Sequence, residues 1–159
     1  MRGIQGLKPL MPLDSLTDVA RNDEDRLKRW VQTVGEVRAL EALALARTRP
    51  HNRTLPELLA EAWLKRRATR YEAQVDLGWA RPDFVLFDVV AGVMVWEING
   101  EYWHANTAAH DAARKQRLLH TTARGLPILK VIEVWEKDIY QSETVFEQAI
   151  GGLSLRGGA

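Results

Sequence analysis

Two apolar stretches of this chain each carry one acidic side chain that a buried strand does not favour. Asp83 opens the stretch at residues 83–87, and Glu97 lies within the stretch at residues 93–99. Acidic side chains are rarely buried unless they are paired or bind a metal ion. Two carboxylates on neighbouring strands can hold one divalent cation between them, so both residues are candidate metal ligands.

An Ala-Gly pair at residues 91–92 separates the two stretches and predicts a hairpin. A strict two-residue turn at this pair would place Leu86 opposite Glu97. Asp83 and Glu97 would then point to opposite faces of the sheet, because side chains alternate along a strand. That register is incompatible with a shared cation.

Adding Val90 to the loop shifts the register and places Val85 opposite Glu97. Asp83, Glu97 and Asn99 then share one face, with the two acids on a diagonal roughly 7 Å apart at Cβ. Hairpin loops of three residues that close in a glycine bulge are common. We therefore expect this three-residue loop, with Asp83 opposite Asn99.

Length and composition set the class of protein. The chain has 159 residues, which suits one domain with a substantial core, and its 22 basic residues nearly balance its 21 acidic ones. The absence of cysteine excludes disulfides and thiolate metal sites, as expected in a reducing compartment. No apolar run approaches the roughly 20 residues that span a bilayer, and no signal-peptide core is present, so we expect a cytoplasmic protein without a membrane partner.

The N-terminal part of the chain predicts helices. Residues 1–13 contain glycine and proline breaks, whereas residues 25–47 carry apolar side chains at helical spacing, with Gly35 as a weak point. A short helix after Asp14 or Ser15 can precede the long one. The apolar stripe is interpreted as packing, and a homodimer seam through this N-terminal helix is the alternative. The stripe comprises Leu27, Trp30, Val31, Val34, Val37 and Leu40.

The rest of the chain alternates between helix and strand patterns. A capping box predicts a helix start at Thr54, which is followed three residues later by Glu57. The expected parts are an N-terminal helical extension (1–50), a domain (51–150) and a flexible tail (151–159). Within the domain the expected elements are a strand at 71–77, the hairpin at 83–99, a helix at 107–124, a strand at 128–135 and a helix at 141–150.

The hairpin is apolar on both faces, so other elements must cover both faces. The connection from the strand at 93–99 through a helix to the strand at 128–135 fits a right-handed parallel crossover. These patterns predict an α/β fold with three layers, α/β/α, around a mixed four-stranded sheet.

Five short motifs follow one another along the chain: Thr54-x-x-Glu57, Arg81-Pro82-Asp83-Phe84, Glu97-x-Asn99-Gly100-x-x-Trp103-His104, Asp111-x-x-Arg114 and Gly125-Leu126-Pro127-Ile128-Leu129. In this order they resemble the PD-(D/E)XK nuclease superfamily. The resemblance is greatest to the very-short-patch-repair endonuclease branch and its small relatives of unknown function. It covers about residues 54–140 and implies a restriction-endonuclease-like fold. The implied activity is that of a metal-dependent DNA endonuclease, for mismatch repair, a phage or a mobile element.

The resemblance implies Mg²⁺ as the cofactor, with Mn²⁺ able to substitute. Asp83 and Glu97 would be direct ligands, and the carbonyl of Ile98 would complete the protein's share of a hard cation's shell. Glu57 would hold a water on the cation or a second ion. The cation would lower the pKa of water and neutralise charge on the phosphate.

One position departs from the family pattern. Most members carry lysine where Asn99 stands, and asparagine cannot take a proton. His104 is the expected substitute, because imidazole titrates near neutral pH and can protonate a leaving oxygen. Lys115 or Lys130 can supply the missing positive charge.

Two clusters of basic side chains predict contacts with nucleic-acid phosphates, with a solvated helix face as the alternative. The residues expected to bind nucleic acid are Lys65, Arg66, Arg67, Arg70, Arg81, Arg114 and Lys115.

Each candidate residue also has a purely structural interpretation. The capping box explains Glu57, a turn after proline explains Asp83, and pairing within a strand explains Glu97. Two further functions therefore stay open: a catalytically inactive nuclease fold that binds nucleic acid or a partner protein, and an RNA-processing nuclease. Metal binding distinguishes the first from an active enzyme, and the substrate distinguishes the second.

Overall fold

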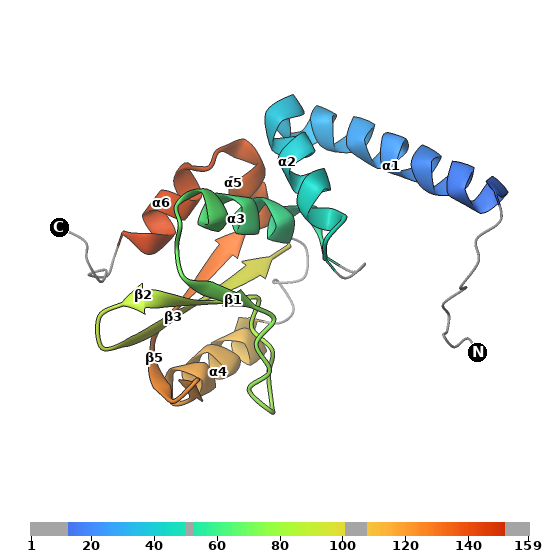
Figure 1. The fold of residues 1–159 in the computed structure, drawn as a ribbon. Coiled ribbons are helices and arrows are strands. Elements are labelled where there is room, and N and C mark those ends of the chain that lie inside the picture. Colours follow the sequence, from blue (N-terminus) through green and yellow to red (C-terminus); the bar gives the residue numbers. More distant parts are fainter. Residues whose placement is uncertain (1–12, 50–52, 101–107, 152–159) are drawn as a thin grey trace. The chain divides into compact units, whose positions relative to one another are not determined.

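The structure, a computed structural model, describes residues 13–49, 53–100 and 108–151 (Figure 1). The chain divides into two compact units, Met1–Thr48 and Arg49–Ala159. Among the described helices, none has both the length and the apolar character needed to cross a membrane.

The first unit contains two helices, α1 (Leu13–Val34) and α2 (Glu36–Ala46). Gly35 separates them with a φ of 88°, a left-handed conformation that glycine adopts without steric cost. The prediction of one continuous helix over residues 25–47 is therefore wrong at Gly35. The homodimer seam, the alternative to packing for the apolar stripe of this segment, stays a prediction.

The second unit begins with the capped helix that the sequence predicts. Helix α3 (Leu55–Arg66) follows Thr54, whose hydroxyl accepts the N–H of Glu57 at 3.4 Å. The carboxylate of Glu57 accepts the N–H of Thr54 in return at 3.1 Å. The capping box is thus confirmed, and it holds the Glu57 side chain at the start of the helix.

A mixed five-stranded sheet forms the centre of the second unit, with strand order β1-β2-β3-β5-β4. Strands β3 and β5 pair in parallel, and the other neighbours pair antiparallel. The α/β class and the parallel pairing are confirmed, whereas the number of strands exceeds the four predicted. The strands are β1 (Tyr71–Ala73), β2 (Phe84–Val89), β3 (Gly92–Asn99), β4 (Thr122–Ala123) and β5 (Leu126–Trp135).

Helices lie on both faces of the sheet (Figure 1). Helices α3 and α6 (Thr144–Ile150) cover one face, where Trp63, Trp96 and Phe146 form an aromatic cluster with ring centres 5.4 to 5.9 Å apart. Such burial of large aromatic surface contributes strongly to a core. The two-sided apolar hairpin is therefore covered as expected on this side.

Helix α4 (Ala108–Leu119) covers the other face through the fully buried Leu118. The side chains that share this part of the core are Val75, Val85, Phe87, Val93, Val95, Ala123, Ile128 and Val131. The alternation of residues between the two faces of the hairpin is thus the predicted one.

The hairpin register differs from the predicted one. Phe84 pairs with Trp96 and Val85 pairs with Val95, so Val85 does not lie opposite Glu97. The observed register is displaced by two residues from the expected one. Because the side-chain period of a strand is two, this displacement leaves the same side chains on the same face.

The loop of the hairpin also differs. Val89 pairs with Gly92, which leaves a two-residue turn rather than three, and the ladder shifts between Leu86 and Val89. An extra residue in β2, rather than a third loop residue, therefore shifts the register so that Asp83 and Glu97 share one face. Ala91, with a φ of 71°, takes the left-handed position of the turn.

Several element boundaries also differ from expectation. Helix α4 ends at Leu119 rather than at residue 124, because the chain reverses at Arg124, whose φ is 53°, and pairs β4 with β5. Strand β1 stops at Ala73 rather than at residue 77. The closing helix predicted at 141–150 begins only at Thr144, as α6, and a helix that was not predicted, α5 (Glu136–Gln141), precedes it.

Candidate active site

The main chain and side chain of Asp83 connect the start of β2 to the end of β3. Its Oδ2 accepts the N–H of Ile98 at 2.7 Å, and its own N–H lies 3.4 Å from Oε2 of Glu97. Its Oδ1 accepts the side-chain amide of Gln74 at 3.2 Å. The structure therefore brings together Asp83 and Glu97, two of the predicted metal ligands. At Ile98 the observed contact with Asp83 is through the N–H, and metal binding by the Ile98 carbonyl stays a prediction.

Burial and neighbouring negative charge disfavour the ionised form of the acids at this point. Burial is the main cause of the raised pKa of Asp83, and the charge of Glu97 adds to it, against the hydrogen bond from the Ile98 N–H. Burial likewise raises the pKa of Glu57, with the charge of Asp83 adding to it and the Thr54 N–H opposing it. The Asp83 carboxyl, just before β2, thus interacts with two other carboxyl groups, Glu57 of α3 and Glu97 of β3.

A guanidinium group from α4 neutralises one of these acids. Nε and Nη2 of Arg114 both lie 2.7 Å from Oε1 of Glu97. Arg114 was expected to contact nucleic acid, and in the structure its side chain is engaged with the acid site. Lys115 lines a small cavity of about 40 Å³ beside the same residues.

Asn99 lies beside a further acid that the sequence interpretation did not single out. Its side-chain amide donates to Oε1 of Glu133 at 2.7 Å, and Glu133 pairs with Glu97 across the parallel strands. The amide is therefore held as a donor. Glu133 stands inside an apolar strand, and the argument that identified Glu97 would have found it.

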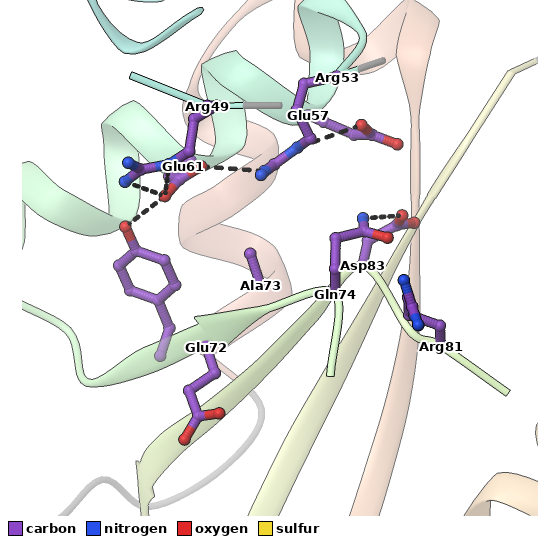
Figure 2. A pocket seen from close by; sticks show the side chains of 10 residues that line it. Arg49, Arg53, Glu57, Glu61, Glu72, Ala73, Gln74, Arg81 and Asp83 are labelled. Carbon is purple, nitrogen blue, oxygen red and sulfur yellow. Dashed lines mark hydrogen bonds and ion pairs between the residues drawn. The ribbon is translucent and has the colours of Figure 1, made fainter. Parts of the chain in front are cut away.

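A larger cleft, of about 760 Å³, opens on the other side of Asp83 (Figure 2). Figure 2 shows Glu61 enclosed by basic and phenolic groups within this cleft. The residues that line it are Arg49, Arg53, Glu57, Glu61, Tyr71, Glu72, Ala73, Gln74, Arg81 and Asp83.

Glu61 is the buried anchor of this cleft, with 2% of its surface exposed. Its Oε2 accepts from Nη2 of Arg49 at 2.7 Å and from the Tyr71 hydroxyl at 2.8 Å, and its Oε1 accepts from Nη2 of Arg53 at 2.9 Å. Burial alone would raise the pKa of Glu61, but the hydrogen bonds from Arg49 and Tyr71 and the charge of Arg53 lower it overall. Glu61 is therefore a stable carboxylate.

Arg53 connects this network to the acid cluster. Its Nε lies 3.5 Å from Oε1 of Glu57, and its side chain is 6% exposed. The i, i+4 spacing of Glu57 and Glu61 on α3 was a signal that both face the same way. The arginines could not be assigned from the sequence, because the segment that carries them reads only as a break at Pro50.

The basic cluster at the end of α3 is engaged with acidic side chains. Arg67 lies 3.1 Å from Glu147, and Arg66 forms an ion pair with Glu143. Lys65 is exposed. This arrangement fits the alternative of a solvated helix face, and nucleic-acid binding by these residues stays a prediction.

Two other predicted contacts lie on the β1–β2 side. The N–H of Arg70 donates to Asp88 at 2.7 Å, and the guanidinium of Arg81 lies 3.6 Å from Asp76. His104 and Trp103 lie outside the described residues.

The oxygen donors at Asp83 fit a hard divalent cation in kind. In residues 13–49, 53–100 and 108–151, no three His, Cys, Asp or Glu side chains are grouped so as to hold a metal ion. Mg²⁺ is commonly held by only one or two carboxylates, with water and substrate phosphate completing its shell. The pair of Asp83 and Glu97 meets that smaller requirement, and a cation would offset the crowding of negative charge.

The chain matches no protein-family model, no curated protein and no solved structure. Its function is therefore inferred from the chemistry of the site.

Proposed function

We propose that this chain is a metal-dependent DNA endonuclease that hydrolyses phosphodiester bonds with Mg²⁺, for which Mn²⁺ can substitute. The observation that supports the proposal best is the pair of contacts that Asp83 makes, with the Glu97 carboxylate through its N–H and with the Ile98 N–H through its carboxylate. Glu57 lies close to Asp83 as well. Burying acidic side chains between two apolar strands costs free energy, and acids in such surroundings are found most often at functional sites.

The order of elements supports a three-layer restriction-endonuclease-like fold. From α3 to β5 the chain runs helix, three strands, helix and strand, with the short β4 added before the last strand. In this proposal the acids lie where β2 begins and β3 ends, so that a phosphate can reach them from the ends of these two strands.

The chain's own residues would hold and orient the reacting groups. Bound to Asp83 and Glu97, with the Ile98 carbonyl, Mg²⁺ would supply charge neutralisation and a more acidic water. Gln74 and the Ile98 N–H fix the orientation of Asp83. Protonation of the leaving oxygen by His104 stays a prediction.

A second function is favoured by the ion pair between Arg114 and Glu97. A guanidinium that already neutralises Glu97 at 2.7 Å removes part of the need for a cation. A nuclease-like fold that binds DNA without cleaving it is consistent with this contact.

The experiment compares cleavage by wild type, Asp83→Asn and a control, Asp76→Asn, on supercoiled, linear, branched and mismatched DNA with Mg²⁺ or Mn²⁺. Asp76 lies in an exposed loop, paired with Arg81, so its replacement has the same charge change without touching the acid site. We expect wild type and Asp76→Asn to nick DNA and Asp83→Asn to lose this activity. Equal nicking by all three would refute the proposal. No nicking, together with no Mn²⁺ uptake by calorimetry, would select the binding module.

A further inference from the structure

A second pocket, of about 320 Å³, lies on the α4 side of the second unit and differs in charge from the cleft at Asp83. Its lining contains one indole, one imidazole and two guanidinium groups, and no carboxylate among the residues that form it. We name it the Trp79–Arg117 pocket; it is lined by Trp79, His110, Ala113, Arg114 and Arg117.

The spacing of its basic side chains follows one face of a helix. His110, Arg114 and Arg117 stand at i, i+4 and i+7 along α4, and residues at these spacings lie on the same side. Arg114 and Arg117 are separated by about 4.5 Å along the helix axis. The pocket therefore presents two guanidinium groups in a row.

Arg117 is held in place by an aromatic ring rather than by an acid. Its guanidinium carbon lies 4.0 Å from the ring centre of Trp79, and Trp79 packs in turn against the core. Within the described part of the chain, its guanidinium forms no ion pair. A guanidinium stacked on a ring keeps its planar edge of N–H donors for a second partner, and phosphate matches that edge.

Arg114 joins this pocket to the acid site. It lines the pocket and also donates to Glu97 at 2.7 Å. The pocket and the acid site therefore adjoin at Arg114, so one polyanionic strand can contact both.

We infer that the Trp79–Arg117 pocket binds a backbone phosphate of the DNA strand, next to the phosphate at Asp83 and Glu97. Arg117 is the main phosphate ligand, and Trp79 is the positioning residue that holds its guanidinium flat. This inference rests on the proposed function for its choice of DNA, but it concerns binding and not cleavage.

The test measures the affinity of labelled single-stranded and duplex DNA against salt concentration in EDTA, so that no cleavage occurs. The variants are Arg117→Ala, Arg117→Lys and Trp79→Leu. The control is Lys137→Ala, which removes an exposed cation on α5. Each lost phosphate contact reduces the salt slope by about 0.7 for single strands and about 0.9 for duplex. We expect that reduction for Arg117→Ala and none for Lys137→Ala.

The other variants separate charge from geometry. Arg117→Lys keeps the charge but not the planar edge, so we expect an unchanged slope with several-fold weaker binding; Trp79→Leu should weaken binding in the same way. Circular dichroism must show that each variant is folded. Competition with inorganic phosphate distinguishes a site for a DNA strand from a site for free phosphate. If the pocket binds a DNA strand, inorganic phosphate at millimolar concentration should not displace the DNA.

The outcomes keep the two proposals distinguishable. If wild type binds and cleaves DNA and Arg117→Ala has an unchanged slope, the pocket is refuted and the nuclease stands. If the slope falls as expected and wild type does not cleave DNA, the pocket stands and the nuclease fails. No DNA binding by wild type, or effective competition by inorganic phosphate, would overturn the pocket's assignment to a DNA strand.

Discussion

Arg53 is a single side chain that touches both halves of the cleft. It donates to Glu61 at 2.9 Å and lies 3.5 Å from Glu57, while its buried Nε has no hydrogen-bond partner among the described residues. A buried polar group without a partner costs free energy. Other contacts of the Arg53 side chain must offset this cost to hold it in its buried position. Glu61 is the contact that fixes it.

Replacing Glu61 with Gln should destabilise the chain severely. Removal of one partner of a buried ion pair leaves the other charges uncompensated and costs about 3–5 kcal/mol. Chemical denaturation would measure the loss in free energy of unfolding. Glu72→Gln is the control, because Glu72 pairs with the exposed Arg124, and it should cost less than about 1 kcal/mol. A loss for Glu61→Gln no larger than for Glu72→Gln would contradict this view of the network.

The same network predicts a direction for the pH dependence of stability. The pKa of Glu61 is lowered in the folded chain, so its stabilisation is complete above the ordinary carboxyl pKa of about 4.3 and is lost as the pH falls further. The difference in unfolding free energy between wild type and Glu61→Gln should therefore shrink between about pH 5 and pH 3. A difference that stays constant over this range would exclude Glu61 as the titrating group.

At the scale of elements, the β2–β3 hairpin sets the register of the acids. Its second strand begins at Gly92, where glycine is needed for a reason other than backbone freedom. A Cβ on Gly92 would lie 2.5 Å from the carbonyl oxygen of Pro127 and 2.6 Å from Cγ of Leu129. Strand β5 therefore approaches β3 so closely that only glycine fits there.

Gly92→Ala should destabilise the sheet, because a main-chain carbonyl of β5 must move to admit the methyl group. Overpacking of this kind typically costs about 1–3 kcal/mol, measured by thermal or chemical denaturation. Ala91→Gly is the matched control at the neighbouring position, where the φ of 71° favours glycine, and it should be neutral or stabilising. If Gly92→Ala is as stable as wild type, the close approach of the strands is wrong.

Local patterns explain why some elements could be predicted. The capping box at Thr54 and the two-faced apolar hairpin depend on residues close in sequence, and both were predicted. The extra residue in β2 could not be, because a bulge is set by how β2 fits β3 and β1. The turn at Arg124 has a left-handed non-glycine residue, which no composition rule favours, so the helix prediction extended to Arg124 instead of ending at Leu119.

At the scale of the whole molecule, cation binding should raise the free energy of unfolding. A ligand that binds only the folded state adds about 2.7 kcal/mol at a hundredfold excess over its Kd. For a chain of this length, we expect Mn²⁺ to raise the Tm by about 5–10 °C at that excess. Calorimetric scans of wild type, Asp83→Asn and Asp76→Asn would measure it.

Asp83→Asn should lose this thermal shift, and Asp76→Asn should keep it. An equal shift in both variants would place the cation away from Asp83. Unlike cleavage, this measurement needs no substrate.

The candidate site could be predicted in part for a physical reason. Asp83 and Glu97 were found because an acid in an apolar strand is conspicuous. The neighbours that decide their charge, Arg114 and Glu133, come from α4 and β5, so their contacts depend on how those elements pack. Arg49 lies 12 residues from Glu61, its hydrogen-bond partner, and no local sequence pattern predicts a contact at that separation.

The shortness of the two outer strands has a consequence for how the chain behaves in concentrated solution. Strand β1 has three residues and β4 has two, and these are the outermost strands in the order of the sheet. An edge strand exposes unpaired main-chain groups that can template aggregation, and a short edge offers few of them. Strand β4, however, reaches only the start of β5, and among the described strands none pairs with the outer side of residues 129–135. That stretch of β5 is therefore the part of the sheet that a neighbouring molecule can extend.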